Sequence, residues 1–330
     1  MAQPRVRCPG ISSRRLEAVA YIPNLNGSAR LAALLESLAE QTVACRTVVV
    51  DNGSTDDSVA MVRERFPEVD VLEIGENLGF GRALNRALAR DESEAFFLLN
   101  NDVVCSPDFF ELMLARLVPG VDAVAGLMTR ADDPGTIDSA GVVADRRTLM
   151  AFDYLRGYPV AAADGAPPPL APSGGAALFR REAFDRAGRF DERIFAYYED
   201  LDLALRLRRN GSRCVLAPDA RVKHLHSATL GNASSRKYAL TGWGRGYLLR
   251  RYGVMTKPAD ALRTIFWETI VCGGQLLLDH TAEGIRGRVN GWRSARGLPR
   301  RTLPPDGLLQ LSTRRAIRNR IRERWGRSLP

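Results

Sequence analysis

Short apolar runs alternate with amphipathic stretches from residue 18 onward. The runs predict strands at residues 18–22, 47–50, 69–74 and 95–99. Between them, apolar residues recur at helical spacing, as in 31–38 and 79–89. Three strand–helix units within about 90 residues predict an α/β fold, with a mostly parallel sheet flanked by helices on both faces.

A polar turn follows each of the four predicted strands. These turns lie at residues 24–27, 51–54, 77–79 and 100–102. In open α/β sheets, ligands bind outside the carboxyl ends of the strands. The sequence therefore predicts a binding site along this edge of the sheet.

The second half of the chain is less regular. Residues 132–172 are rich in Ala, Gly and Pro, which favours a long loop or connection. A helix is predicted to begin at Glu199 and to end before Gly211, and two short strands are predicted at 214–217 and 221–224. Beyond residue 235 the pattern is helical.

The composition is that of an ordinary globular protein of 330 residues, with 45% hydrophobic and 26% charged residues. No apolar run reaches the roughly 18 residues that span a bilayer, and the first residues lack the apolar region of a secretory signal. The five cysteines form no CxxC pair. These features predict a protein of the reducing cytoplasm.

The positive charge is concentrated at the C-terminal end. Residues 244–330 contain 18 basic and 6 acidic residues, a net charge of +12, whereas the first 243 residues carry a net charge of −3. This asymmetry suggests an anionic partner of the C-terminal region, which could be lipid headgroups, nucleic acid or an acidic substrate. The arginines that alternate with apolar residues suit interfacial helices; they are Arg286, Arg288, Arg293, Arg296, Arg300 and Arg301, with Ile285, Trp292 and Leu298. Solvated helix faces are the plain alternative.

Two acidic residues follow predicted strands directly. Asp102 is placed to hold a divalent cation that bridges a diphosphate, or it merely ends the strand. Asp51 could accept a hydrogen bond from a nucleobase, with Gly53 allowing close backbone approach, or it could form an Asx turn.

A second group of titratable residues lies later in the chain. Glu199 and Asp200 open a helix, where the helix dipole favours an ionised carboxylate that can accept a proton. Asp202 points away from them and is expected to pair with Arg206. His224 and His226 share one face of a strand and could ligate a metal together with Asp102, although histidines at strand ends are often structural.

Five segments in order resemble a known family: "VVVDNGSTDDS", "ENLGFGRALNRAL", "FLLNNDV", "SGGAALFRREAFDRAGRFDERIFAYYEDLDLALRLRRNG" and "VKHLHS". They are similar to the GT-A-fold glycosyltransferases of family 2, especially the bacterial rhamnosyltransferase-like and galactofuranosyltransferase-like enzymes. The resemblance covers residues 18–252. It implies a GT-A catalytic domain at 18–235, with a Rossmann-like nucleotide-binding half at 18–128 and an acceptor half at 129–235. Residues 1–17 would form an N-terminal extension and 236–330 a helical, Arg-rich C-terminal region.

The resemblance implies an inverting transfer of a sugar, with L-rhamnose from dTDP-rhamnose as the first choice. The acceptor would be a hydroxyl of a glycan or a polyprenol-linked glycan, and Mn²⁺ or Mg²⁺ would assist. The enzyme would be cytoplasmic and peripheral on the inner face of the membrane.

The resemblance also implies roles for individual residues. Asp200, with Glu199, would be the catalytic base, and Asp102 and His224 would bind the metal, with His226 as a further candidate. Asn100 and Asn101 stand where the family's D-x-D motif has its first positions, so Asp102 alone supplies a carboxylate there. The nucleotide and donor would contact Pro23, Asn24, Asp51, Asn52, Gly53, Asn77, Gly79, Asn100 and Asn101. The donor sugar and acceptor would contact Ser173, Gly174, Gly175, Tyr197 and Tyr198. The first turn, "YIPNLNG", departs from the usual pattern.

Other functions remain open from the sequence. A UDP-linked donor of galactofuranose or N-acetylglucosamine would suit the same motifs. A sugar nucleotidyltransferase on a similar sheet is another alternative, although it gives no reason for Glu199 and Asp200 followed by His224. The Asn100–Asn101 pair also leaves open a non-catalytic sugar-nucleotide binder. A nucleic-acid-binding protein that uses the basic end is the distant alternative. Because no nucleic-acid-binding motif is present, no nucleic acid is expected as a partner.

Overall fold

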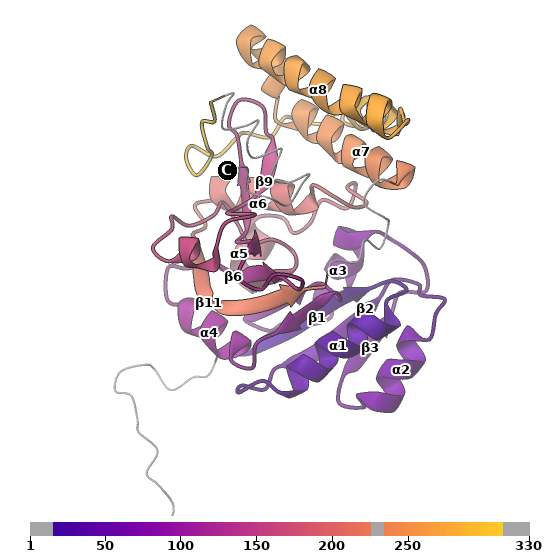
Figure 1. Ribbon diagram of the computed structural model, residues 1–330, viewed down its shortest axis with the longest axis vertical. Coiled ribbons are helices and arrows are strands. Elements are labelled where there is room, and N and C mark those ends of the chain that lie inside the picture. The colour runs from indigo at the N-terminus through magenta and orange to yellow at the C-terminus, as the bar shows by residue number, and fades with distance from the viewer. Residues whose placement is uncertain (1–15, 226–233, 313–330) are drawn as a thin grey trace, which may run out of the picture.

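The computed structural model describes residues 16–225 and 234–312. Among these residues, nine strands form one mixed sheet in the order β3-β2-β1-β4-β10-β6-β11-β5, with β7 paired to β6 (Figure 1). The strands are β1 (Ala18–Asn24), β2 (Arg46–Asp51), β3 (Asp70–Glu73), β4 (Ala95–Leu99), β5 (Val103–Cys105), β6 (Ala123–Arg130), β7 (Ile137–Ser139), β10 (Ala176–Arg180) and β11 (Cys214–His224). A separate pair consists of β8 (Val142–Ala144) and β9 (Ala151–Asp153).

The first half of the sheet is parallel, as the sequence predicts. β1 pairs in parallel with both β2 and β4, and β2 pairs in parallel with β3. The connecting helices are α1 (Ser28–Ala39), α2 (Ser58–Arg65) and α3 (Phe80–Leu88), followed by α4 (Phe109–Arg116). Alternate residues of β1 enter two different cores, since Val19 and Tyr21 join one apolar cluster while Ala20 and Ile22 join the other. Burial on both faces explains why β1, β2 and β4 are almost continuously apolar, whereas the edge strand β3 is partly exposed.

The sheet changes direction at β10, which is antiparallel to both β4 and β6. Beyond it, β11 runs as one strand where two were expected, with a change of register between Ala217 and Arg221. Its last residues pair with β5, so that His224 lies opposite Val103. This pairing brings His224 beside Asp102, the residue that precedes β5.

The expectation of a long loop at 132–172 is wrong. The segment contains β7, β8, β9 and the short helix η1 (Val160–Ala163). Ile137, Val142 and Phe152 are buried because these isolated apolar positions enter different clusters of the core. The small residues between them made the segment look like a loop.

Helices α5 (Arg181–Arg186) and α6 (Glu199–Arg209) precede the C-terminal helices α7 (Ser235–Arg251), α8 (Pro258–Leu278) and α9 (Glu283–Ser294), with η2 (Val254–Thr256) between α7 and α8. Glycines let α7 and α9 approach closely, because a Cβ at Gly246 would collide with the backbone of Arg288 and one at Gly291 with the carbonyl of Trp243. Figure 1 shows α8 at the end of the molecule farthest from β3, with α7 between α8 and the rest. None of the described helices is long and apolar enough to cross a membrane.

Two arginines expected on an interfacial surface are instead engaged inside the protein. Arg288 pairs with Glu268 of α8, and Arg301 pairs with the buried Asp191 and Asp202. Trp292 and Leu298 also pack against an apolar cluster rather than facing outward. A buried carboxylate needs a paired cation, and this requirement explains the position of both arginines.

Candidate functional site

Side chains from the ends of β1, β2 and β4 form a hydrogen-bonded cluster. The Asn101 side-chain amide donates to Asn24 Oδ1 at 2.7 Å, and the Asn24 amide donates to Asp51 Oδ1 at 3.4 Å and to Ser54 Oγ at 3.3 Å. Asp51 accepts from the backbone N–H of Ser54 at 3.0 Å and from its hydroxyl at 2.5 Å. Asp51 therefore forms the Asx turn that the sequence left as an alternative, at the strand ends where ligands bind.

The next turn, at residues 77–79, is attached to Asn52. The Asn52 side chain accepts from the N–H of Leu78 at 2.9 Å and donates to Asn77 Oδ1 at 3.1 Å and to the Gly79 carbonyl at 3.2 Å. Gly79 has a φ of 84°, and a Cβ there would collide with the carbonyl of Phe195. The turn is thereby fixed against the segment that leads into α6.

The Ser173–Gly175 turn lies beside Asn100. A Cβ at Gly175 would lie 3.5 Å from Asn100 Nδ2 and 2.7 Å from the terminal methyl of Met128. The hydroxyl of Ser173 lies 3.2 Å from the Met128 sulfur. The Ser173–Gly175 turn thus lies at the same edge of the sheet as the two preceding groups.

Asp102, His224 and Asp138 form a line of charged groups. His224 Nδ1 lies 2.7 Å from Asp138 Oδ2, and His224 Nε2 lies 3.4 Å from Asp102 Oδ2. Burial lowers the pKa of His224, but its hydrogen bonds to Asp102 and Asp138 and the charges of both carboxylates raise it to about 9. A carboxylate on Nδ1 is the usual way to turn the other ring nitrogen toward a metal.

The chemistry of this pair fits a divalent cation. Asp102 Oδ1 is buried and has no hydrogen-bond partner among the described residues. With its raised pKa, His224 places a positive charge between two carboxylates. A bound cation would supply this positive charge instead. Residues 16–225 and 234–312 contain no group of three or more His, Cys, Asp or Glu side chains that could hold a metal ion. Two protein ligands leave most of the coordination to a diphosphate and water, as in many Mg²⁺ sites.

The line of charges continues through residues that sequence analysis missed. Arg156 bridges Asp138, at 3.2 Å, and Asp153, at 2.9 Å. The charge of Asp153 in turn raises the pKa of Asp200, after the larger effect of burial. All three residues come from the segment interpreted as a loop. Asp138, which lies between Ile137 and the mostly apolar residues 140–144, was the one available signal.

Glu199 and Asp200 begin α6, as expected, after an unusual turn. Tyr197 and Tyr198 have φ values of 67° and 74°, in the left-handed region that non-glycine residues rarely adopt. A Cβ at Gly244 of α7 would lie 2.6 Å from the Tyr197 carbonyl oxygen and 3.0 Å from Tyr198 Cβ. Close packing of α7 therefore supports a strained turn directly before the carboxylate pair.

Burial raises the pKa of both carboxyl groups of the pair, and the charge of Asp200 adds to the shift of Glu199. Glu199 Oε2 is buried without a hydrogen-bond partner among the described residues, whereas Asp200 Oδ1 accepts the N–H of Leu201 at 2.6 Å. A carboxylate with a raised pKa is suited to exchanging protons near neutral pH.

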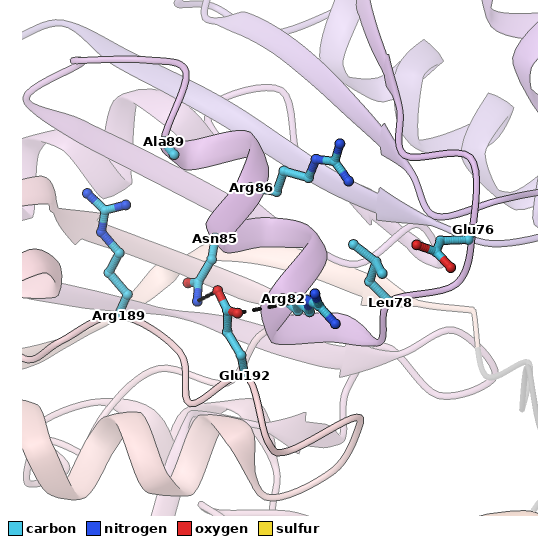
Figure 2. A pocket seen from close by; sticks show the side chains of 8 residues that line it. All are labelled: Glu76, Leu78, Arg82, Asn85, Arg86, Ala89, Arg189 and Glu192. Carbon is cyan, nitrogen blue, oxygen red and sulfur yellow. Dashed lines mark hydrogen bonds and ion pairs between the residues drawn. The ribbon is translucent and has the colours of Figure 1, made fainter.

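The predicted residue His226 is outside the described residues. A cavity of about 440 Å³ beside α3 contains none of the predicted site residues (Figure 2). The Glu192 carboxylate lies 3.2 Å from Asn85 Nδ2 and 3.8 Å from Arg82 Nε. It therefore already has a hydrogen bond and an ion pair within the protein.

Comparison with known proteins identifies the family. The sequence profile of Glycosyl transferase family 2 matches residues 20–188. An N-acetylglucosaminyl-diphospho-decaprenol L-rhamnosyltransferase from Mycobacterium tuberculosis is 31% identical over 237 residues, covering 65% of this chain and 76% of the relative.

Solved structures agree at the level of the fold. The mannosyltransferase PcManGT from Pyrobaculum calidifontis, solved with GDP-Man and Mn²⁺, superposes with a TM-score of 0.53 at 18% identity, covering 87% of this chain and 76% of that one. GalNAc-T7 with UDP, GalNAc and Mn²⁺ gives a TM-score of 0.56 at 13% identity, covering 80% of this chain and 56% of that one. The chain belongs to glycosyl transferase family 2: it is a glycosyltransferase with the expected GT-A fold.

Proposed function

We propose that this enzyme is an inverting glycosyltransferase that moves a sugar from a nucleoside diphosphate to a hydroxyl group of a lipid-linked glycan. The observation that carries the proposal is the series of paired charged residues from Asp102 through His224, Asp138 and Arg156 to Asp153, whose charge helps to raise the pKa of Asp200. An in-line displacement needs a base for the attacking hydroxyl and charge neutralisation for the departing diphosphate. Asp200 and the Asp102–His224 pair offer these two functions.

Each side chain then has a definite task. Asp200 accepts the proton of the acceptor hydroxyl, and Oδ2 is its available atom because Oδ1 already accepts the N–H of Leu201. Asp102 and His224 would hold Mn²⁺ or Mg²⁺, which when bound neutralises charge on the diphosphate. Asp138 keeps the His224 ring oriented. Tyr197 and Tyr198 border the space between donor and acceptor.

The nucleotide would lie over the strand ends of β1, β2 and β4. Asp51, supported by Asn24 and Ser54, faces the base, beside Pro23 and Gly53. The other contacts are assigned to Asn52, Asn77, Gly79, Asn100 and Asn101, and the donor sugar to Ser173, Gly174 and Gly175. The nucleotide half then comprises residues 18–128, the acceptor half 129–235 and the helical region 236–330.

Relatives support the choice of substrates. The Mycobacterium tuberculosis relative is named for L-rhamnose and for an N-acetylglucosaminyl-diphospho-decaprenol acceptor. We therefore take dTDP-rhamnose as the donor and a polyprenol-linked glycan as the acceptor, at the cytoplasmic face of the membrane. Mn²⁺ accompanies the nucleotide or nucleotide sugar in the two structural neighbours, which favours a divalent cation.

A thermal-shift panel tests this function. dTDP, UDP, GDP, ADP and CDP are each added with and without Mn²⁺. A ligand at about 100 times its Kd should stabilise the fold by roughly 2.7 kcal/mol. We expect the largest Mn²⁺-dependent shift with dTDP; a larger one with UDP would redirect the donor assignment. The absence of a shift with every nucleotide would refute the proposed site.

Replacing Asp102 by Asn should weaken the Mn²⁺-dependent part of nucleotide binding by about ten-fold or more, because the carboxylate oxygen is lost from the proposed cation site. Titration of Mn²⁺ at fixed dTDP measures this change. Asp108→Asn is the matched control, since Asp108 is exposed before α4 and its side chain caps nothing. Equal Mn²⁺ dependence in both variants would remove Asp102 from the cation site.

A further inference from the structure

Helix α8 carries large apolar side chains that no described part of the chain covers. Its exposed large residues include Leu262, which is 71% exposed, and Leu277, which is 74% exposed. We call these residues the α8 face: Leu262, Ile265, Phe266, Ile270, Leu276 and Leu277. Their spacing places them on one side of the helix. They extend over 16 residues, from Leu262 to Leu277, or about 22 Å at a rise of about 1.5 Å per residue.

The opposite side of α8 is firmly packed. Trp267 is buried in an apolar cluster, and Glu268 pairs with both Arg245 and Arg288. Burial alone would raise the pKa of Glu268, but these two arginines lower it to about 2. The helix is therefore fixed with its apolar face outward, and its ion pairs point inward.

The helical region that carries this face has a net positive charge, although Asp260 and Asp279 lie at the two ends of α8. Lys257, immediately before α8, is exposed, as are Arg293, Arg296 and Arg300 around the end of α9, and none of the four has an acidic partner among the described residues. Residues 313–330 add seven arginines and one glutamate to the chain. The uncharged α8 face thus belongs to a region with a large excess of positive charge.

We propose that the α8 face docks on the surface of a bilayer that contains anionic lipid. An apolar helix face beside arginine and lysine matches the interfacial layer of such a bilayer, where each basic residue near the surface contributes about 1 kcal/mol. Self-association through the same face would instead bring two positive regions together, which is unfavourable. The charge complementarity therefore favours lipid over a second copy of the chain.

The position of α8 would let docking bring the site close to its acceptor. This step rests on the proposed lipid-linked acceptor. Arg245 of α7 holds Glu268 of α8, and the neighbouring Gly244 packs under the Tyr197–Tyr198 turn. The ion pair between Arg245 and Glu268 therefore connects α8 to the helix that supports the turn before the carboxylate pair. Docking through α8 would keep this site close to lipid headgroups without any segment spanning the bilayer.

Vesicle flotation of the full chain tests the proposal. The probes are vesicles of phosphatidylcholine alone and of phosphatidylcholine with roughly one third phosphatidylglycerol. The test variant combines Leu262→Gln, Phe266→Gln, Ile270→Gln and Leu277→Gln, which retain helix propensity and remove apolar surface. Val118→Gln is the control, because Val118 is 50% exposed and lies outside the helical region. A second variant changes Arg293, Arg296 and Arg300 to Gln.

We expect the wild-type chain and Val118→Gln to float with the anionic vesicles. The four-residue variant should bind these vesicles at least about ten-fold more weakly. The arginine variant should lose the preference for anionic over neutral vesicles. Undiminished flotation of the four-residue variant would overturn the proposal. So would a wild-type dimer that ignores vesicles and that the four substitutions convert to a monomer, since the occupant would then be a second copy.

The same samples separate this proposal from the proposed function. All variants should keep the wild-type melting temperature within a few degrees and the same dTDP response in solution, because the altered side chains are exposed. Loss of vesicle binding with an intact nucleotide response would show that the α8 face acts in vesicle binding and not in nucleotide binding. A missing nucleotide response in the wild-type chain would instead refute the proposed function and leave the vesicle result standing.

Discussion

Replacing Asp200 by Asn is expected to lower the rate of sugar transfer by about 10²–10⁴-fold while nucleotide binding persists. The amide retains the shape of the side chain and can still accept the N–H of Leu201, but it cannot take a proton from the acceptor. Steady-state transfer and the nucleotide thermal shift, measured on the same sample, separate the two effects. Asp57→Asn is the control, because that exposed residue precedes α2 without capping it.

The pH dependence provides an independent test of the same residue. Burial raises the pKa of Asp200, and the charge of Asp153 raises it further. Because the base works only when ionised, kcat should fall on the acid side at a higher pH than an ordinary aspartate, near 3.9, would give. Asp153→Asn removes the second contribution, so the acid limb should move to lower pH. If the acid limb of the Asp153→Asn profile stays in place, the base is not coupled to Asp153. Full activity of Asp200→Asn would exclude Asp200 as the base.

The parallel half of the sheet could be predicted because its signals are local. Strands β1, β2 and β4 are apolar on both faces and each is followed by a polar turn, as Asp51 and Asp102 illustrate. Known rules of open sheets then place those turns on one edge. Glu199 and Asp200 at the start of α6 followed from the same kind of local pattern.

The rest of the candidate site depends on contacts between distant segments. Asp138 and Arg156 lie in the Ala/Gly/Pro-rich region, where nothing in the sequence distinguishes a buried ion pair from surface charge. The same ambiguity affected the arginines near the C-terminus. Arg300 is exposed and Arg301 is engaged by two buried carboxylates, although the two residues are adjacent and identical. Which of them is paired is decided by Asp191 and Asp202, about a hundred residues earlier.

This contrast leads to a large expected effect on stability. Arg301→Ala should destabilise the fold by about 3 kcal/mol, because it removes the cation shared by two buried carboxylates. The side chains of Asp191 and Asp202 are 3% and 0% exposed, respectively. Tyr247 and Tyr252 still donate to them, at 2.7 and 2.9 Å, which keeps the expected loss at the lower end for a broken buried pair. Chemical denaturation at neutral pH measures the change in the free energy of unfolding.

Arg300→Ala is the matched control and should change stability by less than about 0.5 kcal/mol, as an exposed substitution does. Burial alone would raise the pKa of Asp191, but Tyr247 and Arg301 together lower it. A lowered carboxyl pKa contributes stability above the unfolded pKa, and this stability is lost as the pH falls. The difference in free energy of unfolding between Arg301→Ala and wild type should therefore narrow below about pH 4.

Asp191 and Asp202 also flank the Tyr197–Asp200 segment, so we expect kcat to fall in Arg301→Ala even where the protein is fully folded. Equal stability of the two alanine variants would mean that Arg301 does not hold the carboxylates on either side of the proposed base.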